Sequence, residues 1–183
     1  MVPLTDLLLP IVVASLVVWI ASALMWMVLP HHRSDWRKLP DEDTAAAALR
    51  GVAPGQYHIP HADRATMKTE AWKEKARRGP MAMIVVVPPG MPSMGRNLGL
   101  YFVYCLIVSV FVAYLLAHTR GPGSDPMEVC RVAGTAAILG YAGALPPLAI
   151  WFGRRWPSIL KEVLDGIVYG LLTGAVFAWL WPA

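Results

Sequence analysis

Four long stretches of this 183-residue chain contain no Asp, Glu, Lys or Arg. They hold 26, 23, 22 and 18 residues and run over 7–32, 97–119, 132–153 and 166–183. A helix needs about 20 mainly apolar residues to cross the hydrocarbon core of a bilayer. Backbone polar groups find no water there, so each stretch must satisfy its own hydrogen bonds as a helix. The sequence therefore predicts an all-α integral membrane protein with four transmembrane helices.

The expected spans lie near residues 7–29, 98–118, 129–152 and 160–181, within a single membrane domain over residues 1–183. The composition agrees, because 15% of the residues are charged, against roughly 25% in an ordinary soluble domain. The apolar run of the first span continues past Ala21 to Leu29, and no positively charged segment precedes it. We therefore expect an uncleaved anchor and not a signal peptide.

Lys and Arg are distributed unequally between the two sides of these spans. Fourteen lie on one side, in residues 30–97 and 153–159 together with Lys161 just inside the fourth span, and two lie on the opposite side. The two are Arg120 and Arg131. Cytoplasmic loops retain Lys and Arg, so we expect loop 30–97 in the cytoplasm and both termini outside, in a bacterial inner membrane. Retention of positive charge also explains the net charge of +4, so we expect the lipid bilayer and not nucleic acid as a partner.

Residues 30–97 are too many for a bare connection. Glycine and proline punctuation divides them into a helix near 41–50, a strand at 55–59, a basic helix over 63–78 and a strand at 81–87. We expect a small α/β-like or irregular cytoplasmic insertion between the first and second spans.

The basic helix of this insertion carries residues suited to anionic lipid headgroups. They are Lys68, Trp72, Lys73, Arg77 and Arg78. A solvated helix beside a small core is the equal alternative.

Small residues mark the faces on which the last two spans are expected to pack. The fourth span has Gly166, Gly170 and Gly174 at intervals of four, which places them on one stripe, and the third span has Gly140 and Gly143. Small residues allow helix backbones in a membrane to approach closely. The stripe predicts either a tight hairpin of spans three and four or a contact with another protein.

Charged residues at the inner end of the fourth span are expected to form ion pairs. Lys161 and Asp165 are four residues apart and share a helix face. Asp165 can pair instead with Arg154 or Arg155.

Histidines give the strongest hint of a metal site. His58 and His61 have a short ligand-like spacing, and the adjacent His31 and His32 follow the first span. Two to four imidazoles on the cytoplasmic side suit Zn²⁺ or another borderline metal. Against this, Pro60 prevents a regular helical display of the first pair, and no cysteine or well-placed acid joins the histidines.

Other chemistries find no support in the residues. No nucleophile motif, His-Glu-x-x-His pattern or phosphate loop occurs, so we predict no enzymatic activity. No ionisable group lies near the middle of any span, which disfavours a proton-coupled carrier.

These features favour a structural or accessory subunit of a larger membrane complex, in contact with other subunits or with copies of itself. One alternative is a small channel or carrier formed by oligomerisation. Another is a metal- or cofactor-handling membrane protein that uses the loop histidines. No cofactor other than such a metal is expected.

Overall fold

The computed structural model describes all 183 residues and divides the chain into two compact units. The first unit comprises residues 1–36 and 93–183, and the second comprises residues 37–92. The first unit is a bundle of helices, and the second contains the two strands of the chain.

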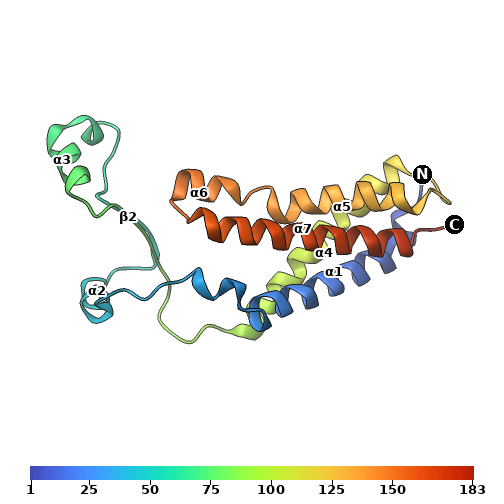
Figure 1. Ribbon diagram of the computed structural model, residues 1–183, viewed down its shortest axis with the longest axis horizontal. Helices are drawn as coiled ribbons and strands as arrows, with labels where there is room; N and C mark the ends of the chain where they lie inside the picture. The colour runs from blue at the N-terminus through green and yellow to red at the C-terminus, as the bar shows by residue number, and fades with distance from the viewer. The chain divides into compact units, whose positions relative to one another are not determined.

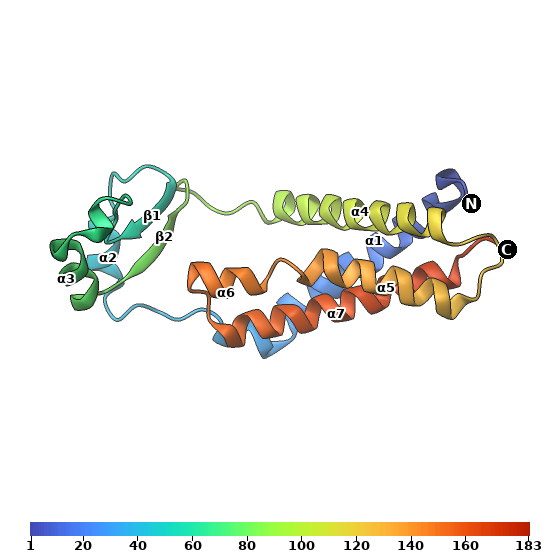
Figure 2. The ribbon, with the colours of Figure 1, turned by 90° about the horizontal axis from the view of Figure 1, so that it is seen from above.

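Four long helices and one short helix build the first unit, and the long ones lie side by side (Figures 1 and 2). Their bounds are α1 Leu8–Ala23, α4 Met94–Thr119, α5 Pro126–Ala142, α6 Pro146–Phe152 and α7 Trp156–Trp179. The helical rise of α1 continues into a π-helical turn over Leu24–Val28. A 3-10 turn over Pro30–Ser34 follows it.

Three helical segments of this unit are long and apolar enough to cross a membrane. They are Leu4–Val28, Met94–Thr119 and Pro126–Phe152, and they overlap the first three expected spans. Membrane association is therefore supported by the length and hydropathy of these helices. At the position of the fourth expected span the structure has α7, whose first turns carry Lys161, Glu162 and Asp165.

The third of these segments is interrupted, as the two prolines near its end predict. Helix α5 stops at Ala142, and α6 begins at Pro146. Proline cannot donate to the preceding turn, but it is tolerated at the first position of a helix, where no donor is needed. Gly153 then ends α6 with φ of +65°, a left-handed conformation that glycine adopts without strain.

The glycine stripe of α7 lies against α5. A Cβ atom built on Gly170 would meet Ile138 Cγ1 at 2.3 Å and the Gly134 carbonyl oxygen at 2.9 Å. One built on Gly174 would meet the Cys130 carbonyl oxygen at 2.7 Å. Real Cβ atoms do not approach backbone so closely, so these two positions permit the contact between the helices only as glycine.

The other predicted packing glycines have different neighbours. Gly166 continues the stripe, because its Cβ would lie 2.8 Å from the Cβ of Ala142 on α5. Gly140 faces α4, where a Cβ would lie 3.1 Å from Val108 Cγ1. At Gly143 the nearest atoms to a Cβ belong to Leu139, in the last turn of its own helix.

Helix α1 packs on α4 and α7, and α4 also packs on α5. A buried hydrogen bond joins α1 to α4, in which Ser15 Oγ donates to Ser109 Oγ at 3.1 Å. Such hydroxyl pairs satisfy polar groups between helices that are otherwise apolar.

The C-terminus is tied to the connection between α4 and α5. The backbone N–H of Gly123 donates to the Pro182 carbonyl at 2.9 Å. The indole Nε1 of Trp181 donates to the Gly121 carbonyl at 3.0 Å. Both termini lie at this end of the bundle (Figures 1 and 2).

The second unit matches the predicted order of helices and strands. It has α2 at Glu42–Ala48, β1 at Gly55–Ile59, α3 at Glu70–Arg78 and β2 at Ala82–Val86. The strands pair antiparallel, from Gly55 opposite Val86 to Ile59 opposite Ala82 (Figure 2). The prediction of two short strands around a basic helix is confirmed.

Candidate functional site

A partly buried group of charged and imidazole side chains lies where the chain leaves α1 and meets the first turns of α7. We call it the histidine–aspartate cluster, and it consists of His31, His32, Asp35, Lys161 and Asp165. The 3-10 turn over Pro30–Ser34 carries both histidines. Because proline occupies the first position of this turn, its backbone is already set for a helical start.

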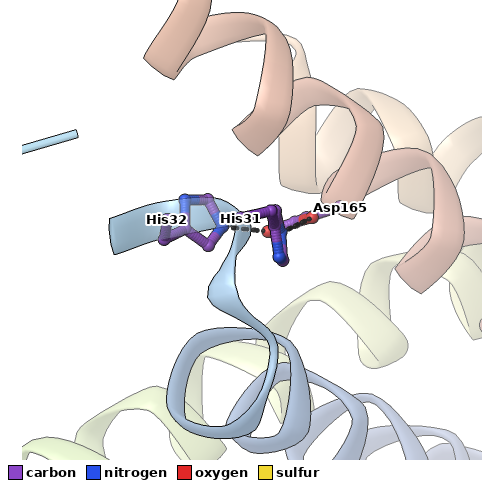
Figure 3. Close-up of side chains that lie close together, drawn as sticks. All are labelled: His31, His32 and Asp165. Atoms are coloured by element: carbon purple, nitrogen blue, oxygen red, sulfur yellow. Dashed lines mark hydrogen bonds and ion pairs between the residues drawn. The ribbon is translucent and has the colours of Figure 1, made fainter. Parts of the chain in front are cut away.

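The two carboxylate oxygens of Asp165 each contact one imidazole (Figure 3). Its Oδ1 lies 3.1 Å from His31 Nε2, and its Oδ2 lies 2.7 Å from His32 Nε2. Asp165 is 3% exposed and His32 is 6% exposed. A buried carboxylate must be paired, and two imidazoles from one turn provide the partners.

The other ring nitrogen of His32 contacts a second carboxylate. His32 Nδ1 lies 2.6 Å from Asp35 Oδ2, and Lys161 Nζ donates to Asp35 Oδ1 at 2.8 Å. The same ammonium donates to Ser34 Oγ at 2.8 Å. Polar contacts thus run without a break from Lys161 through Asp35, His32 and Asp165 to His31.

The contacts of the cluster shift the pKa values of His32 and Asp35. Burial lowers the pKa of His32, but its hydrogen bonds to the Asp35 and Asp165 carboxylates, together with their charges, outweigh this effect, so the pKa lies above its usual 6.5. Burial raises the pKa of Asp35, yet hydrogen bonds from Lys161, His32 and Ser158 bring it down to about 2. With both ring nitrogens of His32 facing carboxylates, the imidazolium form is favoured.

The ion pairs differ from those expected at the start of α7. Asp165 pairs with the two histidines and not with Lys161, Arg154 or Arg155. Lys161 instead reaches back to Asp35. Arg154 binds Glu162, with one of its two contacts at 3.0 Å. The prediction failed because the turn after α1 supplies partners that are remote in sequence.

The two predicted pairs of histidines belong to different compact units. His31 and His32 belong to the cluster, whereas His58 lies in β1 and His61 follows that strand, in the second compact unit. The acids that complete the cluster, Asp35 and Asp165, were absent from the sequence-based metal hypothesis. One feature of the sequence does single out Asp165: it is the last charged residue before a stretch of 18 uncharged ones.

The predicted membrane-surface residues lie on or beside α3 and are largely paired with acids of the same helix. Lys73 Nζ binds Glu70 at 2.7 Å, and Arg78 Nε binds Glu74 at 3.1 Å. Pairs of this kind on an exposed helix contribute about 0.3–0.5 kcal/mol each. They reduce the positive charge that α3 presents.

Two imidazoles and a carboxylate form a donor set for a metal ion. The ligand atoms that His31, His32 and Asp165 offer all lie within 4.8 Å of one another. Imidazole nitrogen suits Zn²⁺, Fe²⁺, Co²⁺ and Ni²⁺, and two histidines with one carboxylate leave positions open for further ligands. Replacement of the shared protons by a metal ion would also neutralise the buried carboxylate.

No protein family, curated protein or solved structure matches this chain. The arguments for its function therefore come from its own geometry and from the chemistry of the side chains that the fold brings together.

Proposed function

We propose that this chain is a four-span protein of a bacterial inner membrane that binds a divalent transition-metal ion through His31, His32 and Asp165. The observation that carries the proposal is the convergence of two imidazole nitrogens on one buried carboxylate. This retains the metal-handling alternative from the sequence but exchanges His58 and His61 for Asp165.

The contacts of α7 support a fourth span. Its glycine stripe packs along α5, which belongs to one of the long apolar segments. The hydrogen bonds of Gly123 and Trp181 hold the C-terminus beside residues 121–124, at the far end of α7 from Asp165. A helix with these neighbours is expected to lie at the same depth in the bilayer as they do. In this topology the cluster lies at the cytoplasmic ends of the spans.

Asp35 and Lys161 support a metal ligand role for His32. Ligating histidines usually donate their second ring N–H to a carboxylate, which fixes the tautomer and the ring orientation. With Nε2 directed to the metal, Nδ1–H of His32 would keep its hydrogen bond to Asp35. Lys161 in turn fixes Asp35. The outer contacts that a metal site needs are therefore already made.

Zinc stoichiometry tests the proposal. The protein is purified in mild detergent, stripped with a chelator, loaded with Zn²⁺ and desalted, and metal per chain is measured by elemental analysis. We expect about one Zn²⁺ per chain, lost in His32→Ala and in Asp165→Asn. His58→Ala and His61→Ala are matched controls that should retain it. Loss of zinc only in these controls, or no bound zinc in the parent protein, would overturn the proposal.

The accessory-subunit hypothesis is the competing proposal. One observation in its favour, the glycine stripe of α7, is weakened by the structure. The glycines of α7 are already occupied by α5, so this stripe offers no surface to a partner. The compact unit of residues 37–92 is the remaining feature that favours a partner protein. Native gels of tagged protein in mild detergent, with mass spectrometry of each band, would decide between a complex and a lone oligomer.

A further inference from the structure

A cavity of about 590 Å³ opens among the ends of α1, α4, α5 and α7, at the same end of the bundle as the histidine–aspartate cluster. Small-molecule sites typically have volumes of about 300–1,000 Å³ and combine an apolar lining with a few polar groups. The lining here is mainly apolar and aromatic, and it includes Trp26, Tyr101, Tyr104, Tyr141 and Tyr169. The proposed metal site does not explain this lining.

Three tyrosines of the cavity, Tyr104, Tyr141 and Tyr169, form an edge-to-face series. The ring centroids of Tyr104 and Tyr141 are 5.8 Å apart with planes at 80°, and those of Tyr141 and Tyr169 are 5.7 Å apart with planes at 83°. Aromatic pairs favour this geometry. The hydroxyl of Tyr104 is satisfied, because it donates to the Gly140 carbonyl at 2.7 Å.

Two hydroxyls of the series have no hydrogen-bond partner. Tyr141 is 8% exposed and Tyr169 is 4% exposed, and the hydroxyl of each is buried and unpaired. The Cys105 thiol lies near Tyr141 and the Trp26 indole near Tyr169, without forming a hydrogen bond to either hydroxyl. A thiol is a weak acceptor, and an indole N–H only donates. Both hydroxyl protons therefore lack a good acceptor, which is unfavourable for a buried donor.

The charges around the cavity exclude two classes of ligand. No Lys or Arg lines it, so a phosphate headgroup would find no counterion. Its two carboxylates are already paired, Glu162 with Arg154 and Asp165 with the histidines, so a cation would find no unpaired carboxylate. A neutral molecule with hydrogen-bond acceptors fits best.

We propose that this cavity binds a lipophilic quinone, with its carbonyl oxygens accepting from Tyr141 and Tyr169 and its flat ring lying among the aromatic side chains. A quinone is neutral, carries acceptors on an aromatic-sized ring and has a tail that the bilayer accommodates. Two separate unpaired donors suit its two carbonyls. The proposal concerns binding alone and does not rest on the metal site, because neither tyrosine belongs to the cluster.

Equilibrium dialysis of the detergent-purified full chain against a short-tailed benzoquinone tests the proposal, with bound quinone read from its ultraviolet absorption. We expect saturation at about one quinone per chain, with and without chelator. Tyr141→Phe and Tyr169→Phe should each weaken binding about five-fold, the typical value of one hydrogen bond. Tyr114→Phe, on α4 and outside the lining, is the matched control and should bind like the parent protein.

The variants also report on the ligand-free state. Removing an unpaired buried hydroxyl leaves the ring packing intact, so Tyr141→Phe and Tyr169→Phe should unfold at the same or a higher temperature than the parent protein. A lower unfolding temperature in both would show that the hydroxyls have partners inside the chain and would overturn the proposal. It would also be overturned by the absence of saturable quinone binding, by displacement of quinone by phosphatidylcholine at equal concentration, or by equal affinities in all three variants.

Discussion

The imidazole of His32 lies flat on the indole of Trp26, with ring centroids 3.8 Å apart and planes within 11° of each other. His32 belongs to the histidine–aspartate cluster, and Trp26 lines the cavity beside it. A cation over an indole face is stabilised by the negative potential of the ring, so the stack favours the protonated His32 that the two carboxylates also favour. The stacked pair of His32 and Trp26 therefore connects the proposed metal site to the proposed ligand site.

Asp35→Asn is expected to weaken metal binding without abolishing it. Asp35 holds Nδ1 of His32 and is not one of the three proposed ligands. Loss of such an outer carboxylate typically costs 10–100-fold in metal affinity. Competition with a chromophoric chelator measures the affinity, and saturating zinc should still give one ion per chain.

Asp41→Asn is the control for this experiment, because Asp41 is an exposed carboxylate that caps α2 in the second unit. An unchanged zinc affinity in Asp35→Asn would show that Asp35 serves only to pair with Lys161. Complete loss of zinc would place Asp35 among the ligands.

Asp165→Asn is expected to destabilise the metal-free protein. The substitution removes the charge that faces both imidazoles and leaves the buried His32 with one carboxylate in place of two. Removing one partner of a buried ion pair typically costs about 3–5 kcal/mol. Thermal unfolding in detergent with chelator, followed by circular dichroism, measures the loss. Asp6→Asn, at an exposed carboxylate near the N-terminus, should leave the transition unchanged. Equal transitions for both variants would mean that the cluster contributes nothing to folding.

Helices and strands were predictable because their signals are local. A charge-free stretch of helical length, or a short β-branched run ended by prolines, requires no knowledge of other parts of the chain. The strands expected at 55–59 and 81–87 are found as β1 and β2 within one residue at each end. The break before Pro146 follows from the chemistry of that residue alone.

The cluster was not predictable in the same way, because it depends on where distant segments meet. His31 and Asp165 are 134 residues apart in sequence. Sequence spacing suggested the nearby Lys161 as the partner of Asp165, and the folded chain replaces it with the turn after α1. The glycine stripe was predictable as a packing face, but only the fold shows that α5 occupies it.

Gly174→Leu is expected to disrupt the contact between α5 and α7 in the isolated chain. The first carbon of any side chain at this position would lie 2.7 Å from the backbone oxygen of Cys130, and backbone cannot yield as a flexible side chain can. Overpacking a core costs about 1–3 kcal/mol or more. The unfolding temperature should fall even without a partner protein.

Gly99→Leu provides the matched control, because a Cβ atom at Gly99 on α4 has nothing within 4 Å. It should unfold with or above the parent protein, since leucine favours helix over glycine. If Gly174→Leu unfolds like this control and instead loses only its association with other proteins, the stripe faces a partner, as the accessory-subunit hypothesis requires.

Labelling of single cysteines in intact cells tests the proposed fourth span. In a Cys105→Ala, Cys130→Ala background, a membrane-impermeant maleimide should reach Gly121→Cys and Ala183→Cys from outside, because Gly121 and the C-terminus are hydrogen-bonded neighbours at one end of the bundle. Ala62→Cys, in the second unit, should react only after lysis, since the surrounding excess of Lys and Arg is retained in the cytoplasm. With three spans, Ala183→Cys would be labelled together with Ala62→Cys and not with Gly121→Cys. That result would require the contacts of Gly123 and Trp181 to be absent in the membrane, and it would remove α7 from the bilayer.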